Sequence, residues 1–191
     1  GIIENFAELR AELAERGVTL NSETDTEVVA HLLAEVLPTV GMDLAEGMRV
    51  VCRRLSGAFT LVAVHSDVPD VVVGARRNSP LVVGRGEGEN CLASDVAAFI
   101  AHTRNAIELG QDQVVELRRD SIAVTTFDGS PADVVEYEVT WDASAAEKGG
   151  YDTFMAKEIA EQPKAVADTL LGRIGSDGRL KLDEMRLSEA E

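Results

Sequence analysis

Residues 58–67 read AFTLVAVHSD and residues 71–76 read VVVGAR, and these two runs decide the fold class. Both are short and rich in β-branched residues, a composition typical of β-strands. Residues 67–70 include Pro69 and are typical of the turn between two strands. At this point the chain changes from a helical pattern to a strand-like one.

Before these strands, the apolar residues recur at helical spacing. The pattern predicts three helices, over residues 5–16, 26–37 and 43–55. Asn5 and Glu8 have the spacing of a capping box at the first helix, and Thr24 and Glu27 have it at the second. We therefore expect side chains of these residues to cap the N-termini of the first two helices.

After these strands, further β-structure is expected. The predicted elements are a hairpin over residues 80–95 that turns at 86–88, a short helix over 96–102, a hairpin over 113–129 that turns near 119–121, and a last strand over 134–141. Residues 151–174 are helical in pattern, and Pro163 starts a new turn there or kinks the helix. This order predicts an α+β layered domain with mostly antiparallel sheet.

The composition is that of one globular domain. The chain has 191 residues, of which 45% are hydrophobic and 27% charged. The formal net charge of −16 argues against nucleic acid or an anionic membrane as a partner, because both repel an acidic surface. No apolar run reaches the length of a membrane span and no signal peptide is visible. Cys52 and Cys91 fit buried thiols in a reducing compartment, so we expect a cytoplasmic protein.

Residues 22–28, SETDTEV, contain the first candidate for binding chemistry. Asp25 lies at the start of a predicted helix, where its carboxylate can face the ammonium group of a ligand. The same residue types are also preferred at any helix N-terminus, for capping and for the helix dipole. On spacing alone the second interpretation is favoured.

The other candidate motifs point to structure more than to chemistry. Residues 84–90, GRGEGEN, lack the Gly-Lys-Ser/Thr of a phosphate loop, and a hairpin turn is favoured. His31, His65 and His102 have no metal-ligand spacing, and Cys52 reads as a packed helical thiol. The paired arginines are isolated in an acidic chain and do not form a basic patch. We therefore expect no metal site and no cofactor, and the residues by themselves name no complete catalytic set.

Four longer segments carry a family resemblance. They are residues 1–33, residues 55–64 (LSGAFTLVAV), residues 76–95 (RRNSPLVVGRGEGENCLASD) and residues 151–163 (YDTFMAKEIAEQP). Together they resemble the glutamine–fructose-6-phosphate aminotransferase (isomerising) family, the glucosamine-6-phosphate synthases. The similarity runs from Gly1 to about Ile174, and residues 151–163 look like the segment that joins the family's glutaminase domain to its sugar isomerase domains.

The resemblance implies a fold and a chemistry. The family's class II glutamine amidotransferase domain is an N-terminal-nucleophile hydrolase, a four-layer αββα sandwich with mostly antiparallel sheets. An N-terminal cysteine attacks the glutamine side-chain amide and its free α-amino group serves as the base. By the resemblance, Gly1 matches the glycine of the family's Asn-Gly pair, whose amide helps to bind glutamine, and Asp25 matches the carboxylate that holds the substrate's α-amino group.

The resemblance also implies that the chain is a fragment, incomplete at its N-terminus. We expect residues 1–143 to be the C-terminal part of the glutaminase domain, residues 144–175 a helical segment at the domain boundary, and residues 176–191 a linker toward absent isomerase domains. No catalytic residue is expected in the chain, which would then bind glutamine but lack activity. Fructose-6-phosphate would bind only to the absent domains, and the parent enzyme is expected to be a homodimer.

Two alternatives stay open at this point. The chain can be a stand-alone, non-catalytic binding module on the amidotransferase scaffold, or a fragment of another class II amidotransferase such as amidophosphoribosyltransferase. The segment at residues 151–163 argues against the second alternative.

Overall fold

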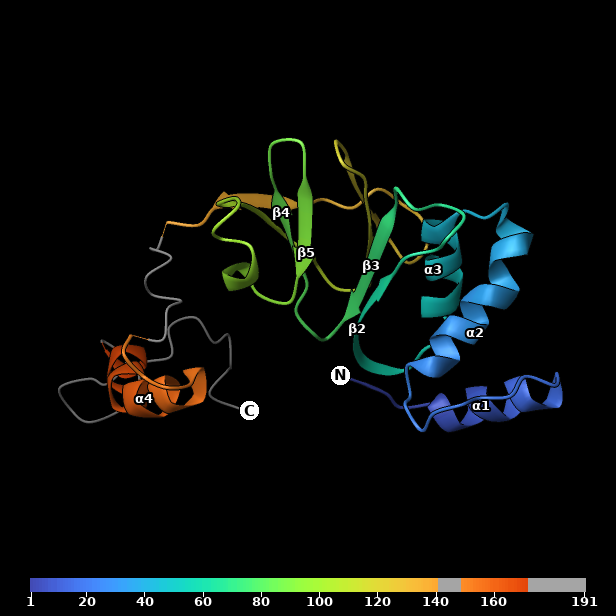
Figure 1. Ribbon diagram of the computed structural model, residues 1–191, viewed down its shortest axis with the longest axis horizontal. Coiled ribbons are helices and arrows are strands. Elements are labelled where there is room, and N and C mark those ends of the chain that lie inside the picture. The colour runs from blue at the N-terminus through green and yellow to red at the C-terminus, as the bar shows by residue number, and fades with distance from the viewer. Residues whose placement is uncertain (141–148, 172–191) are drawn as a thin grey trace, which may run out of the picture. The chain divides into compact units, whose positions relative to one another are not determined.

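The computed structural model of the chain describes residues 1–140 and 149–171 (Figure 1). The chain divides into two compact units, Gly1–Trp141 and Asp142–Glu191, and each is described by itself. The first unit contains the candidate site. Among the described residues, no helix is long and apolar enough to cross a membrane.

Three helices and one 3₁₀ turn form the first layer of this unit. Their bounds are α1 Phe6–Glu15, α2 Glu27–Val36, η1 Leu37–Val40 and α3 Leu44–Cys52, which confirms the three predicted helices with shorter ends. Each helix buries one apolar face, as the periodicity predicts. The buried side chains include Leu9, Leu13, Val28, Leu32, Met48 and Val51.

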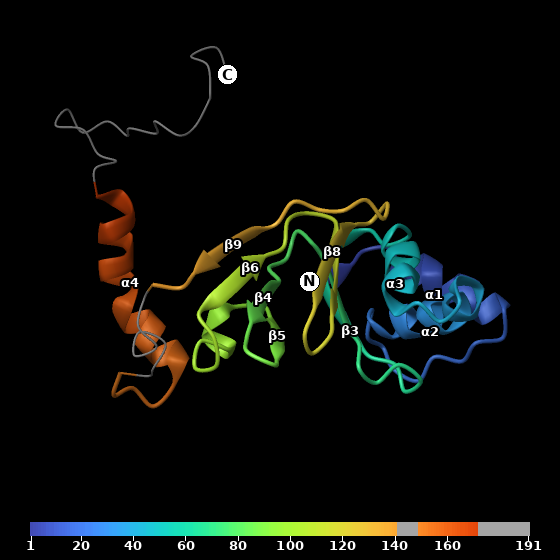
Figure 2. The same ribbon diagram turned by 90° about the horizontal axis from the view of Figure 1, so that it is seen from above.

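Nine strands form two sheets in the described part of this unit. The first sheet has the order β1-β2-β3-β7-β8, with bounds Ile2–Ile3, Gly57–Ala63, Val72–Arg77, Gln113–Leu117 and Ile122–Thr126. The second has the order β5-β4-β6-β9, with bounds Asn90–Ala93, Val82–Arg85, Asn105–Glu108 and Val135–Glu138. All strand pairs in the two sheets are antiparallel, and both predicted hairpins, β4–β5 and β7–β8, are confirmed (Figure 2).

The alternation along β3 shows how the layers stack. Val73 and Ala75 pack in the cluster that includes the helices, whereas Val72 packs in the cluster between the sheets. A Cβ on Gly74 would meet side chains of the second sheet region, Leu92 and Leu81. The layers therefore follow the order helices, first sheet, second sheet, and the α+β fold with mostly antiparallel sheets is confirmed.

The outer face of the second sheet is covered in part by η2, a 3₁₀ turn at Val96–Ala98. The predicted helix over residues 96–102 is therefore only this one turn. Phe99, which follows it, lies 2.7 Å from the position that a Cβ on Gly84 would take. Gly84 thus makes room for the buried Phe99 ring on that face.

Both predicted capping boxes are wrong. Asn5 precedes α1, but its side chain bonds the carbonyl of Arg54 and the amide of Ser56, at 2.8 and 2.9 Å, instead of capping the helix. Thr26 is the residue before α2 and makes no side-chain cap, and Glu27 bonds the preceding loop. In both cases the side chain that local spacing assigns to helix capping bonds residues farther away along the chain instead. Asp43 does cap α3, accepting from the amide of Glu46.

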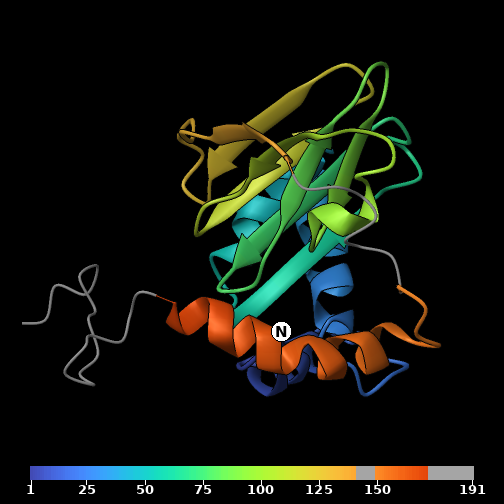
Figure 3. The ribbon, with the colours of Figure 1, turned by 90° about the vertical axis from the view of Figure 1, so that its left-hand side faces the viewer.

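The second unit contains one described helix, α4 Phe154–Leu170, which continues through Pro163 (Figure 3). The Thr153 side chain caps it by accepting from the amide of Ala156 at 3.1 Å. Residues 144–148 and 172–175 of the predicted boundary segment, and the whole predicted linker at 176–191, lie outside the described residues.

Candidate functional site

A cavity of about 340 Å³ with both polar and apolar lining residues lies where β1, β2 and the start of α2 meet. Its lining brings together Gly1, just before β1, and Asp25, in the turn before α2, the two site residues that the sequence predicts. The other lining residues are Ile3, Thr26, Phe59, Thr60, Leu61, Ser79, Pro80 and Ser94.

Asp25 is held against strand β1. Its Oδ2 accepts a hydrogen bond of 2.8 Å from the backbone amide of Ile3. Among the described residues, no donor bonds the other carboxylate oxygen, Oδ1. One oxygen therefore fixes the strand, and the other can accept from a cationic ligand in the cavity, close to the N-terminus of α2.

The loop before α2 is fixed by Glu27. The Glu27 carboxylate accepts from the backbone amides of Asn21 and Ser22, each at 2.7 Å, and from the Ser22 hydroxyl. These hydrogen bonds lower the pKa of Glu27 to about 2, and the bond from the amide of Asn21 contributes most to this shift. Glu27 therefore shapes the loop that presents Asp25, a role that the spacing with Thr24 conceals.

Gly1 lies too close to strand β2 for any other residue. Ile2 is opposite Ala58 in the antiparallel register, which brings Gly1 against the same strand. A Cβ on Gly1 would lie 2.3 Å from the carbonyl oxygen of Ala58 and 2.9 Å from Cα of Phe59. Only glycine fits this approach, and it leaves the backbone of residue 1 at the cavity.

The β2 side of the cavity is anchored from the helix layer. Phe59 stacks on Phe127 with ring centroids 6.3 Å apart. The Arg77 guanidinium lies over both rings, at 5.6 and 5.1 Å, and pairs with Asp112 at 2.6 Å. No residue pattern in the sequence predicts this cluster, and the only hint is that Phe59 and Leu61 share the buried face of β2.

The rest of the lining supplies hydroxyl and backbone groups. Thr60 Oγ1 donates to the carbonyl of Pro80 at 3.1 Å, which ties β2 to the segment before β4. Ser79 and Ser94 add hydroxyls. No His, Cys or Lys stands among the lining residues within the described part of the chain. The carboxylate of Asp25 allows the cavity to bind a small polar cation, but no lining side chain carries a thiol or an amine for nucleophilic catalysis.

The cysteines and histidines stay apart from the cavity. Cys52 is buried in α3, and burial raises the pKa of its thiol to about 12, so it is a packed thiol as predicted. Both cysteines are free, but Cys91 is only half-buried, so the expectation of two buried thiols is wrong for Cys91. His31 pairs with Glu27 on the edge of α2. In residues 1–140 and 149–171, no cluster of three His, Cys, Asp or Glu residues has metal-site geometry.

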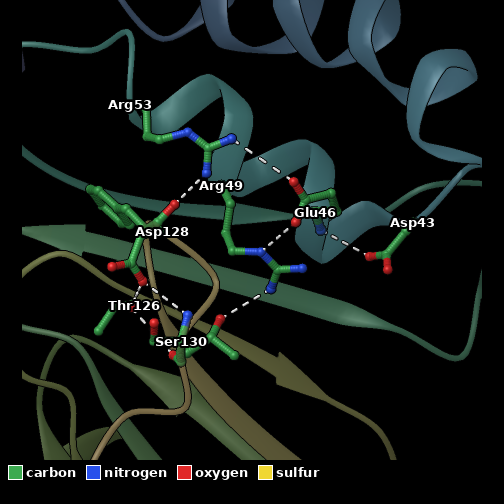
Figure 4. Close-up of polar contacts among 9 residues, drawn as sticks. Asp43, Glu46, Arg49, Arg53, Thr126, Asp128 and Ser130 are labelled. Atoms are coloured by element: carbon green, nitrogen blue, oxygen red, sulfur yellow. Dashed lines mark hydrogen bonds and ion pairs between the residues drawn. The ribbon is translucent and has the colours of Figure 1, made fainter.

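Two arginines, one in α3 and one directly after it, bond within the fold. Arg49 donates to the carboxylate of Glu46 at 2.7 Å and to the hydroxyl of Thr125 at 3.0 Å, and Arg53 donates to the carbonyl of Phe127. Figure 4 shows Arg49 on α3 and Arg53 at its end, together with Glu46. Asp128 lies in the adjacent turn, where the hydroxyl of Thr126 lowers its pKa. These contacts connect α3 with the turn after β8.

A second, more apolar cavity of about 480 Å³ runs between α2 and β2. Its apolar lining includes Val29, Leu33, Leu37, Met48, Leu61 and Ala63. Strand β1 pairs with β2 only at Gly57 and Ala58, so the described part of the chain leaves the rest of that edge of β2 without a strand partner. Val62 and Val64 are 58% and 70% exposed there.

Comparison with known proteins gives the family. Residues 1–101 match the glutamine amidotransferase domain family. Glutamine–fructose-6-phosphate aminotransferase (isomerizing) of Streptomyces coelicolor is 78% identical over 98% of this chain and 30% of its own length. The Corynebacterium glutamicum and Mycobacterium leprae proteins of the same name are 58% and 53% identical over 100% of the chain. The chain thus spans about 30% of the length of these curated relatives.

A solved structure supports the fold. Glutamine phosphoribosylpyrophosphate amidotransferase from B. subtilis, complexed with ADP and GMP, matches with a TM-score of 0.54 and 21% identity, over 64% of this chain and 27% of its own. This likeness concerns the fold alone. The layered antiparallel fold, the cavity that joins Gly1 to Asp25 and the match over residues 1–101 agree with one another, and the chain belongs to the glutamine amidotransferase domain family.

Proposed function

We propose that this chain is part of a longer enzyme that forms glucosamine-6-phosphate and glutamate from fructose-6-phosphate and glutamine. The observation that carries the proposal is the meeting of Gly1 and Asp25 in one cavity. The names of the relatives, which are 53–78% identical to this chain, supply the reaction.

In this proposal the cavity binds the amino-acid end of glutamine. Asp25 Oδ1 accepts a charge-assisted hydrogen bond from the substrate's α-ammonium group while Oδ2 keeps its bond to Ile3. The backbone amide of Gly1 donates to the substrate, and the hydroxyls of Thr60 and Ser94 contribute polar contacts at the rim. The Asp25 carboxylate favours the positive charge of an α-ammonium group, and the N-terminus of α2 favours the negative charge of an α-carboxylate. Together they make the cavity selective for an amino acid.

The chemical step needs groups from outside this chain. An N-terminal cysteine thiolate would attack the amide carbon of glutamine, ammonia would leave, and water would then hydrolyse the thioester to glutamate. The free α-amino group of that N-terminal cysteine would act as the base. Neither Cys52 nor Cys91 lines the cavity, which supports the proposal that the 191-residue chain by itself is inactive.

The remaining parts of the proposal concern partners and location. Fructose-6-phosphate would bind to isomerase domains outside this chain, and the whole enzyme would be a homodimer. A net charge of −16 disfavours nucleic acid and anionic membranes as partners. Two free thiols suit a reducing cytoplasm.

Two alternatives have weaker support. A fragment of amidophosphoribosyltransferase would share the fold, but the likeness to such a structure is only 21% in sequence. A stand-alone binding module would need the cavity to function without an upstream nucleophile. The chain covers only about 30% of the length of its relatives, which favours a part of a longer enzyme.

The experiment that tests the proposal starts from the gene. Its coding sequence on both sides of the 191-residue segment is read, and the whole product is purified. Incubation with glutamine and fructose-6-phosphate should release glutamate and glucosamine-6-phosphate in equal amounts. A whole product that binds glutamine but forms neither product would support the binding module. In a parallel incubation with glutamine and phosphoribosyl pyrophosphate, formation of phosphoribosylamine and pyrophosphate would identify the other amidotransferase.

A further inference from the structure

Arg76 is a buried arginine that points into the space between the two sheets. Its side chain shares a face of β3 with Val72 and Gly74, the face that packs on the second sheet region. Only 9% of Arg76 is exposed. It lies opposite Thr60 on β2 and Gln113 on β7, and Gln113 is also buried.

The hydrogen bonds of Arg76 leave its charge uncompensated. Nη1 donates to the carbonyl of Leu109 at 2.6 Å, but the buried Nε has no hydrogen-bond partner. In residues 1–140 and 149–171, Nε of Arg76 is the only buried side-chain polar atom of this kind. No carboxylate of the described residues forms an ion pair with Arg76.

The neighbouring Arg77 shows what a compensated arginine looks like in this strand. It points to the opposite face, pairs with Asp112 at 2.6 Å, donates to the carbonyl of Leu55 and covers two aromatic rings. Among the described residues, Arg77 thus has an anionic partner and Arg76 has none.

Physical chemistry makes an unpaired Arg76 costly. A guanidinium cannot lose its proton at any physiological pH, so it cannot escape burial by becoming neutral. A buried charge without a counter-ion, and a buried donor without an acceptor, both destabilise a fold. Leu or Met would fill this position between two sheets without that cost. An arginine here therefore indicates an anionic partner.

The position of Arg76 relates the missing anion to the candidate site. Thr60, directly opposite Arg76 in the register, lines the cavity of Gly1 and Asp25. Thr60 also bonds Pro80, another lining residue. Arg76 therefore lies one strand inward from the cavity, on the side that faces the second sheet.

We propose that Arg76 is the cationic half of a carboxylate site between the two sheets, and that the carboxylate comes from outside the described residues of this chain. A carboxylate would supply both the counter-charge and the acceptor for Nε. Its two oxygens can accept from Nε and from an Nη of one guanidinium in the bidentate arrangement. Two sources share this chemistry: an acidic side chain from another part of the protein, or the carboxylate of glutamine or glutamate in the adjacent cavity. The second source rests on the proposed function.

The test uses the whole protein, with the variants Arg76→Met, Arg76→Lys and Arg85→Met. Met removes the charge at similar volume, and Lys keeps the charge but loses the fork. Arg85 is the control, because its ion pair with Glu136 of β9 is exposed and neither residue lines the cavity. Thermal denaturation is measured from pH 7 downward, with and without L-glutamate, and the KM for glutamine is measured separately from kcat.

The two sources give different results. If the carboxylate is an acidic side chain, Arg76→Met lowers the ligand-free melting temperature at pH 7, and the deficit shrinks as pH falls below about 4, where that carboxylate is protonated. If it is the substrate's, the ligand-free melting temperature does not fall, KM for glutamine rises at least about tenfold, and stabilisation by glutamate is lost. Arg76→Lys is intermediate in both cases, and Arg85→Met matches the wild type.

One result overturns the inference. If Arg76→Met equals the wild type in ligand-free melting temperature, in its pH dependence, in KM and in stabilisation by glutamate, no carboxylate pairs with Arg76. Failure of the proposed function is distinguishable, because a wild-type protein that does not use glutamine still reports on Arg76 through the ligand-free measurements.

Discussion

The carboxylate of Asp25 accepts a hydrogen bond of 2.8 Å from the backbone amide of Ile3, a residue 22 positions earlier in the chain. This bond joins strand β1 to the start of α2 and places Asp25 beside Gly1 in one cavity. Asp25 therefore has a structural role as well as its proposed role in binding, and experiments on it must separate the two.

Asp25→Asn and Asp25→Ala in the whole protein separate these roles. Asn keeps an oxygen that accepts from Ile3 but loses the charge, whereas Ala loses both. We expect both variants to lower kcat/KM for glutamine roughly ten- to 150-fold, the equivalent of a charge-assisted bond of about 1.5–3 kcal/mol. Only Ala should also lower the free energy of unfolding, by about 1 kcal/mol. Glu23→Gln, at an exposed neighbour, is the control. A wild-type KM and kcat in Asp25→Asn would leave Asp25 with the structural role alone.

Gly1→Ala in the whole protein should displace strand β1. The added Cβ would lie 2.3 Å from the carbonyl oxygen of Ala58, a distance that only movement of the backbone can relieve. We expect a large loss of glutamine-dependent glutamate release, measured with a coupled glutamate assay. Gly17→Ala is the matched control, because it costs about 1–2 kcal/mol through its positive φ of 83° but meets no atom within 4 Å and lies away from the cavity. Equal activity losses in the two variants would assign the effect to stability alone.

Glu27→Gln should change the acid side of the stability curve. Hydrogen bonds lower the pKa of Glu27 from 4.5 to about 2, so the folded state binds the proton less tightly than the unfolded state. The stabilisation is present above pH 4.5 and is lost as pH falls toward 2. The melting temperature of the wild type should therefore exceed that of Glu27→Gln by a constant amount from pH 7 to pH 5, and the difference should shrink at lower pH. A difference that stays constant down to pH 2.5 would show that the charge of Glu27 contributes nothing.

The isolated 191-residue chain should not hydrolyse glutamine. It has no N-terminal thiol, and the pKa of Cys52, raised to about 12 by burial, leaves almost no thiolate at neutral pH. Glutamate release should equal that of a buffer blank. Release that exceeds the blank and survives both thiol alkylation and Asp25→Ala would show that the chemistry lies elsewhere in the chain.

The isolated chain should also depend on a partner for stability. The apolar cavity of about 480 Å³ beside β2 opens at a strand edge that the described residues leave largely unpaired. Each buried polar group without a partner costs about 1–3 kcal/mol, against a net stability of about 5–15 kcal/mol for a whole domain. We expect low stability at low protein concentration, rising when a segment or a second copy covers this edge. A monomer with a cooperative denaturant transition of ordinary domain stability would contradict this expectation.

The sequence by itself determined most of the elements and their order. The apolar spacing of α2 and α3, the β-branched runs of β2 and β3, and the glycines between β4 and β5 act over a few residues, and the structure confirms them. The class of fold followed from that order. Strands β1 and β6 were missed because two and four residues, without a turn motif beside them, are too few to show a period.

Only the tertiary structure decided which side chains meet. Asn5 and Glu27 have the spacing of capping residues, but partners brought near by folding, Ser56 for one and Asn21 for the other, bind them instead. Arg76 and Arg77 are consecutive and chemically identical, yet the pleat sends one to Asp112 and the other into the space between the sheets. The physical reason is that hydrogen bonds and ion pairs act only over a few ångströms in space, whereas residue patterns report only on neighbours along the chain.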